Sequence, residues 1–122
     1  MTLRLVFSET SQAILERRQT VTRRFGDEFL LIEPGTIIEA VSSDWMLVCP
    51  IKVPLLNRLE VVSVKAEILR ALIDDLEYGQ NELRLEGLSP SISPSTRVAQ
   101  IFTRHKDVSL DSLIARIEFR YV

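Results

Sequence analysis

The sequence predicts an α+β fold, because strand-like segments lie toward both ends of the 122-residue chain and helix-like segments fill the middle. Segments near the N-terminus alternate apolar and polar side chains, as a half-buried strand does. After residue 65 the apolar residues recur every three or four positions, which is the spacing of an amphipathic helix. The last nine residues alternate again. This order predicts a curved or closed sheet capped by helices.

Five segments have the alternation or the β-forming residues that are typical of strands. They cover residues 3–7, 20–25, 36–41, 59–64 and 114–122. In the second segment a regular strand places Thr20, Thr22 and Arg24 on one face, because side chains alternate along a strand. Such a face is suited to line a polar pocket. Pro34-Gly35 predicts the turn before the third strand.

Helices are expected where apolar residues recur with a period of about 3.6. They cover residues 11–17, 66–76 and 81–85, and a further helix begins near residue 94. Gly79 is expected to stop the helix over 66–76 and Gly87 the helix over 81–85, because glycine commonly ends a helix. Ser93 followed by Pro94 has the pattern of an N-cap with proline at the first helical position.

The composition argues against several classes of protein and site. No apolar run of about 18 residues exists and the short apolar start does not resemble a secretory signal, so we expect no membrane span and a cytoplasmic location. Cys49 and His105 are the only cysteine and histidine, so neither an internal disulfide nor a usual zinc site can form. Asp74, Asp75 and Glu77 point in different directions on a helix, which favours a solvated face. We therefore expect no metal and no cofactor.

The chain as a whole is not basic, so any nucleic-acid site must be a local patch of basic residues. The formal net charge is −2, and 12 arginines accompany 3 lysines. Arginine suits bidentate contacts to phosphates and bases better than lysine does. Four of the arginines lie between residues 17 and 24. This cluster is either a solvated basic face or a binding patch, and the composition alone leaves both open.

Several segments resemble, in the same order along the chain, the motifs of ASCH domains in the PUA-like superfamily. They are Gln19-Thr20-Val21-Thr22-Arg23-Arg24, similar to the family's Lys-Thr-x-Thr-x-Arg; Pro34-Gly35-Thr36, similar to Pro-Gly-Asp; Glu86-Gly87-Leu88, similar to Glu-Gly-Phe; and the closing strand Ile117–Tyr121. The resemblance implies a single domain over residues 1–122, with a PUA-like curved or closed β-barrel and flanking helices. It also implies a cleft for RNA or a nucleotide-like ligand.

One branch of this family hydrolyses the acetyl amide of acetylated cytidine, using the lysine of the motif, its second threonine and a later glutamate. By resemblance Thr22 stands at the nucleophile position, Glu86 at the acid position and Gln19 at the lysine position. A threonine hydroxyl needs a nearby base or cation to attack near neutral pH, and glutamine cannot accept its proton. His105 can replace the base only if the fold brings it near Thr22. The departure at Gln19 therefore favours binding over catalysis.

Three hypotheses for the function follow, and the first is a binding domain for RNA or a modified nucleotide. In it, four arginines hold phosphate and three neighbouring polar residues read a base edge. The phosphate-binding set is Arg17, Arg18, Arg23 and Arg24, and the base-reading set is Gln19, Thr20 and Thr22. The second is an amidohydrolase for acetylated nucleosides that uses Thr22 and Glu86. The third is a protein-interaction or regulatory domain that uses the apolar stretch Trp45–Leu56. We expect a monomer or a weak homodimer.

Overall fold

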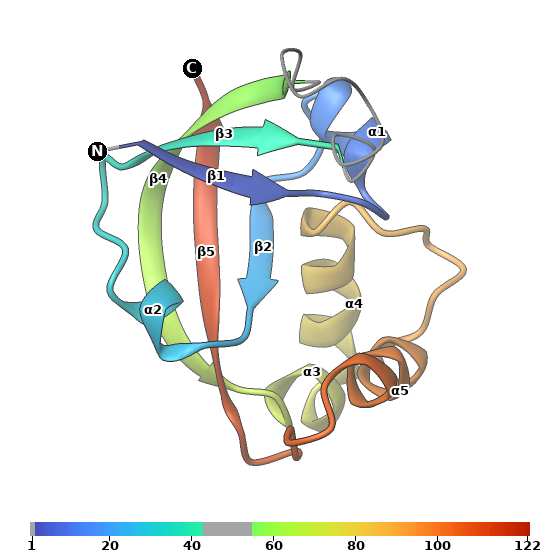
Figure 1. Ribbon diagram of the computed structural model, residues 1–122. Helices are drawn as coiled ribbons and strands as arrows, with labels where there is room; N and C mark the ends of the chain where they lie inside the picture. The colour runs from blue at the N-terminus through green and yellow to red at the C-terminus, as the bar shows by residue number, and fades with distance from the viewer. Residues whose placement is uncertain (1, 43–54) are drawn as a thin grey trace.

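The computed structural model describes residues 2–42 and 55–122, and it confirms the predicted α+β class (Figure 1). Within these residues the elements are β1 (Thr2–Val6), α1 (Ser11–Leu15), β2 (Val21–Arg24), α2 (Asp27–Leu30), β3 (Ile37–Val41), β4 (Leu55–Ile68), α3 (Ala71–Asp74), α4 (Leu76–Leu85), α5 (Pro94–Arg104) and β5 (Leu113–Tyr121). Each predicted strand overlaps one of the observed strands. None of the helices described is both long and apolar enough to cross a bilayer.

The apolar stretch Trp45–Leu56, predicted as an interaction surface, lies outside the described residues apart from its last two positions. Leu55 and Leu56 begin β4, where Leu55 is exposed and Leu56 packs at the edge of the core. Cys49 also lies outside the described residues.

All the strands of the described ranges belong to one sheet, in the order β1-β3-β4-β5-β2. β1 and β3 run parallel, and the other neighbouring strands run antiparallel. β4 bends along its length, with a register shift between Val61 and Ser63, and it curves the sheet (Figure 1). β1 and β2 are the two edges, and the sheet is not closed between them. The predicted curved sheet is thus present, but its closed, barrel-like form is not.

Two hydrophobic clusters hold the helices against this sheet. The larger one combines strand residues with Ile14 of α1 and includes Phe7, Ile38, Ile117 and Phe119. The smaller one joins α3 and α5 to the start of β5; its members are Leu69, Leu72, Val98, Ile101 and Ile114. α5 begins as predicted, because the Ser93 hydroxyl accepts a hydrogen bond from the backbone N–H of Thr96 at 3.1 Å. The second cluster therefore packs α5 against α3 and the start of β5.

The prediction of a helix over 66–76 is wrong, because its apolar residues lie partly in a strand. β4 continues to Ile68, which pairs with Leu113 of β5. The chain then turns through the short α3, and the longer helix α4 begins only after Asp75. The Asp75 side chain caps α4 by accepting a hydrogen bond from the backbone N–H of Tyr78 at 3.1 Å. The long ladder between β4 and β5 thus overrides the helical spacing of the sequence.

Gly79 does not end a helix, contrary to the sequence prediction, but lies inside α4. A Cβ atom at this position would lie 2.0 Å from the backbone oxygen of Leu72. Glycine is required here because α3 and α4 approach too closely for a side chain. Gly87 does end α4, as predicted. It has a φ of +78°, and the next N–H, that of Leu88, donates to the carbonyl of Leu83 at 3.0 Å.

Candidate functional site

A cavity of about 310 Å³ opens between the end of β1, the strand β2, the end of α4 and the helix α5. Its wall includes four residues of the motif segment, namely Gln19, Thr22, Arg23 and Arg24, together with Glu86. The fold therefore brings together five of the residues that the sequence identified as candidates. The cavity lies where the two edges of the sheet approach one another, since Val6 and Phe7 of the β1 side also line it.

Gln19 lines this cavity and has an unsatisfied oxygen. Only 2% of the residue is exposed, and its Nε2 donates a hydrogen bond to the Val21 carbonyl at 2.9 Å. Its Oε1 is buried and has no hydrogen-bond partner among the described residues. A buried acceptor without a donor costs about 1–3 kcal/mol, so the site is suited to a ligand that supplies an N–H or O–H group.

Thr22 and Arg24 share one face of β2, as the alternation of the sequence predicts. Arg24 Nε donates to Thr22 Oγ1 at 3.2 Å, and Arg24 Nη2 donates to the Val6 carbonyl at 2.8 Å. The guanidinium also lies over the ring of Phe7, with Cζ 4.8 Å from the centroid. Burial lowers the pKa of Arg24 to about 10, assisted by repulsion from Arg97 and opposed by Glu86. Arg24 is therefore a charged, largely buried group at neutral pH.

Arg24 forms no ion pair with any carboxylate of residues 2–42 and 55–122, and its guanidinium donates instead to a hydroxyl and a backbone carbonyl. A buried cation of this kind is stabilised when an anion binds beside it. The cavity thus offers a cationic group as well as the unsatisfied acceptor of Gln19.

Arg23 has a different environment, since its guanidinium lies among three carboxylates. Its side chain is 1% exposed and forms ion pairs with Glu67 at 2.8 Å, Glu82 at 2.5 Å and Glu86 at 2.8 Å. Tyr78 of α4 also contacts the guanidinium, at 3.4 Å. Burial by itself lowers the pKa of Arg23, but Glu86 and Glu67 outweigh it and raise that pKa. Arg23 therefore connects β2 to α4 and β4 inside the protein.

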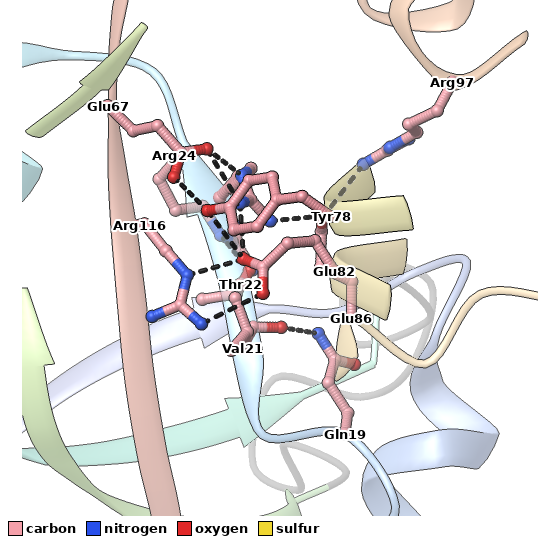
Figure 2. Close-up of polar contacts among 11 residues, drawn as sticks. Gln19, Val21, Thr22, Arg24, Glu67, Tyr78, Glu82, Glu86, Arg97 and Arg116 are labelled. Carbon is pink, nitrogen blue, oxygen red and sulfur yellow. Dashed lines mark hydrogen bonds and ion pairs between the residues drawn. The ribbon is translucent and has the colours of Figure 1, made fainter. Parts of the chain in front are cut away.

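Two glutamates of this cluster have opposite pKa shifts. Burial favours the neutral form of Glu82, but hydrogen bonds from Arg116 at 2.6 Å and from Arg23 at 2.5 Å outweigh it and lower its pKa. Burial raises the pKa of Glu86, despite the opposing charges of Arg23 and Arg97. Figure 2 shows the carboxylate of Glu82 directed from α4 toward β2. Glu86 is the member of the cluster that also reaches the cavity.

Aromatic side chains form another part of the cavity wall. They are Phe7, Phe25, Phe29 and His105. The rings of Phe25 and His105 are stacked, with centroids 4.8 Å apart and planes inclined by 37°. His105 thus lies at the cavity, as one hypothesis required, but the Thr22 hydroxyl is hydrogen-bonded to Arg24 instead.

The other predicted site residues do not line this cavity. Arg17 and Arg18 are exposed; Arg17 Cζ lies 5.8 Å from the centroid of the Tyr121 ring, and Arg18 Nε pairs with Glu16 at 2.6 Å. Thr20 contributes backbone hydrogen bonds that join α4 and β5, its N–H donating to Leu85 and its carbonyl accepting from Phe119. These three residues lie along the chain that leads into β2.

Three charged residues at the cavity were missed by the sequence reasoning, namely Glu9, Arg97 and Arg104. Arg97 and Arg104 are seven positions apart on α5, a spacing that places them on one helix face. That spacing was the available signal in the sequence. Glu9, in the loop after β1, forms ion pairs with both arginines. Its sequence position carries no comparable signal.

The part of the chain that the structure describes contains no group of three or more His, Cys, Asp or Glu side chains arranged to hold a metal ion. The cavity instead combines a buried acceptor, cationic groups and aromatic rings.

Comparison with known proteins identifies the fold. The chain superposes on an ASCH domain from Lactobacillus crispatus with a TM-score of 0.70 and 12% sequence identity, over 98% of this chain and 79% of that one. It also superposes on a mutant of the ASCH protein ZmASCH from Zymomonas mobilis, with a TM-score of 0.54 and 16% identity over 96% and 68% of the two chains. The chain has the ASCH fold.

A third solved structure of the same shape is a DUF984 protein from Enterococcus faecalis, with a TM-score of 0.66 and 12% identity over 100% of this chain and 76% of that one. No protein-family model and no curated protein matches the sequence itself. The similarity to these proteins therefore lies in the three-dimensional fold.

Proposed function

We propose that this chain is an ASCH-domain protein that binds RNA or a modified nucleotide in the cavity beside β2. The observation that carries the proposal is that one cavity contains both the unsatisfied Oε1 of Gln19 and the partly buried cation Arg24, which has no carboxylate partner among the described residues. A nucleotide supplies what both lack, because its base carries N–H donors and its phosphate is anionic. The ASCH fold of the chain supports the same proposal.

The base lies at the inner end of the cavity in this proposal. Gln19 Oε1 accepts a hydrogen bond from an amino or imino N–H of the base, and Thr22 offers a hydroxyl in the same cavity. Phe7 and the stacked pair of Phe25 and His105 offer ring faces or edges at the wall. Stacking on an aromatic side chain is worth about 1–3 kcal/mol per base.

The size and charge of the cavity support this class of ligand. A volume of about 310 Å³ is at the lower end of the range for small-molecule sites, which suits one nucleotide unit better than a larger ligand. Of the arginines proposed to hold phosphate, Arg24 is the one available at the cavity. Arg23 is already bound by three carboxylates. Arg17 and Arg18 then contact only those parts of an RNA that extend beyond the cavity.

The test is isothermal titration calorimetry of the purified protein with ribonucleosides, N4-acetylcytidine and a short single-stranded RNA. Gln19→Leu removes the unsatisfied acceptor while keeping the volume, and we expect it to weaken binding by about tenfold or more. The matched control is Gln12→Leu, since Gln12 is exposed on α1 and lies outside the cavity wall. Thermal unfolding of each variant shows whether the fold is intact.

Two results would contradict the proposal. One is the absence of heat of binding for every nucleoside and RNA with the wild-type protein. The other is equal affinity of the wild type and a folded Gln19→Leu variant.

A second candidate is the amidohydrolase, because Gln19, Thr22 and Glu86 line the same cavity. These are the positions that match the catalytic residues of the enzymatic branch by resemblance. We expect no turnover of N4-acetylcytidine by the wild type, since Gln19 has no group that takes the proton of the Thr22 hydroxyl. Turnover in the wild type that is lost in Thr22→Ala would favour the enzyme. Activity that appears only in Gln19→Lys would show that this one position separates binding from hydrolysis.

A further inference from the structure

The outer end of the cavity is formed by three charged side chains, Glu9, Arg97 and Arg104, which we call the rim. Their exposure increases outward from the cavity floor. The Glu86 side chain on the floor is 5% exposed, whereas those of Arg97, Glu9 and Arg104 are 16%, 35% and 54% exposed. The rim is thus the more exposed part of the cavity, and it carries two cations against one carboxylate.

Arg97 is not satisfied by its partners at the rim. It lies 3.5 Å from Glu9 and 3.9 Å from Glu86, both longer than the roughly 2.7–2.9 Å of a charge-assisted hydrogen bond. Its Nε is buried and has no hydrogen-bond partner among the described residues. The two carboxylates balance the charge of Arg97 but leave its donors available.

Glu9 occupies the position between the two arginines of α5. Its Oε2 pairs with Arg97 and its Oε1 with Arg104, so a single carboxylate is shared by two cations and leaves a net positive charge. Glu9 lies in the loop that connects β1 and α1, and its side chain is partly exposed. An ion pair of this exposure is weak and is easily exchanged for another anion.

We propose that the rim is a subsite for a phosphate monoester, and that Glu9 occupies this subsite when no ligand is bound. The inference rests on the proposed function, because it assigns the outer end of the same nucleotide cavity. A phosphate monoester carries about −1.5 to −2 charges at neutral pH and three acceptor oxygens. Two guanidinium groups are better complemented by the charge and oxygens of this phosphate than by those of one carboxylate. The ligand class is therefore a nucleotide with a terminal phosphate.

The terminal phosphate can belong to a free nucleoside 5′-monophosphate or to the 5′ end of an RNA, and both present the same group to Arg97 and Arg104. Calorimetry with a nucleoside, its 5′-monophosphate and ribose 5-phosphate measures the separate contributions of base and phosphate. We expect the monophosphate to bind about tenfold more tightly than the nucleoside, with an advantage that shrinks as salt is added. RNAs of one sequence with a 5′-phosphate or a 5′-hydroxyl distinguish the two sources.

Variants at the rim test the role of Glu9. Glu9→Gln removes the competing anion, and we expect it to tighten binding of the monophosphate by about two- to fivefold. Arg97→Gln and Arg104→Gln are each expected to lower the affinity for the monophosphate to that for the nucleoside. Asp111→Asn and Arg70→Gln are the matched controls, since these residues form an exposed ion pair outside the cavity wall.

The outcomes separate this inference from the proposed function. Equal affinities for nucleoside and monophosphate, with no effect of Glu9→Gln or Arg104→Gln, reject the subsite and leave the base cavity standing. If ribose 5-phosphate binds with an affinity that Glu9→Gln changes, and no nucleoside binds, the subsite is supported and the base cavity is rejected. Absence of binding for all three compounds rejects both. Arg104 is more than half exposed, so its replacement tests the subsite even if Arg97→Gln unfolds the protein.

Discussion

Arg23 Nη1 and Glu86 Oε2 meet at 2.8 Å in the wall of the cavity, and their ion pair joins β2 to the end of α4. The next residue, Arg24, faces the cavity and has no carboxylate partner among the described residues. Two adjacent arginines of one motif thus have different environments, because alternation along β2 turns their side chains to opposite sides.

Replacement of these two arginines is expected to have contrasting effects. Arg23→Gln leaves three buried or half-buried carboxylates without their common partner, and we expect it to destabilise the fold by about 3–5 kcal/mol. Arg24→Gln removes a cation without a carboxylate partner, so we expect a smaller loss of stability and about a tenfold loss of nucleotide affinity. Urea unfolding and calorimetry on both variants check this. Equal loss of stability in the two variants would contradict the division of roles.

Glu82 is expected to contribute more to stability than an exposed glutamate in a comparable pair. It accepts hydrogen bonds from Arg23 and Arg116, and its side chain is 3% exposed. Glu82→Gln weakens both contacts, and we expect a loss of about 3–5 kcal/mol in the free energy of unfolding. In the control Glu60→Gln, which removes the exposed ion pair with Arg120, the expected loss is at most about 1 kcal/mol. Chemical denaturation of both variants measures the difference, and similar losses would show that the buried network is not cooperative.

The stability of the protein is expected to depend on pH through Glu82 and Glu86. The pKa of Glu82 is lowered in the folded state, so its contribution is present above the pKa of the unfolded chain and is lost as the pH falls through the folded value. The pKa of Glu86 is raised, so its contribution is present below the unfolded pKa and is lost as the pH rises through the folded value.

Glu86→Gln should therefore remove the loss of stability that develops as the pH rises above the ordinary pKa of a glutamate. Denaturant midpoints measured from acidic to neutral pH test this, with Glu77→Gln, exposed on the same helix, as the control. A constant difference between Glu86→Gln and the wild type at every pH would show that Glu86 does not titrate in this range.

Gly79→Ala is expected to destabilise the protein, although helix propensity alone predicts the reverse. Alanine is more favourable than glycine inside a helix by about 1 kcal/mol. The new Cβ would lie 2.0 Å from the Leu72 carbonyl oxygen, so α4 must move away from α3, at a cost near the upper end of about 1–3 kcal/mol. Thermal unfolding decides the sign, with Gln80→Ala at the exposed neighbouring position as the control. A stabilised Gly79→Ala would mean that the two helices separate easily.

Local patterns predicted the features of the fold that depend on neighbouring residues. The faces of β2, the Ser93 cap of α5 and the end of α4 at Gly87 each follow from a few adjacent side chains. The extension of β4 to Ile68 does not, because it depends on a ladder with β5, some 45 residues later in the chain. The helical spacing of that segment indicated a helix that the sheet excludes.

The candidate site was only partly predictable for the same physical reason. The motif segment and Glu86 were identified, and the fold places Gln19, Thr22, Arg24 and Glu86 at one cavity. The partners of Arg23 lie 44 to 63 positions away, so no local pattern could show that its charge is neutralised internally. The contact between Glu9 and α5 is equally remote in sequence.

The open edge between β1 and β2 has a consequence for engineering. Arg24 spans this gap with a single hydrogen bond to the Val6 carbonyl, where a continuous backbone ladder would otherwise close the sheet. A redesign that pairs β1 directly with β2 would add backbone hydrogen bonds and raise the melting temperature. It would also fill the space between Phe7 and Thr22, so the gain in robustness would remove the ligand cavity.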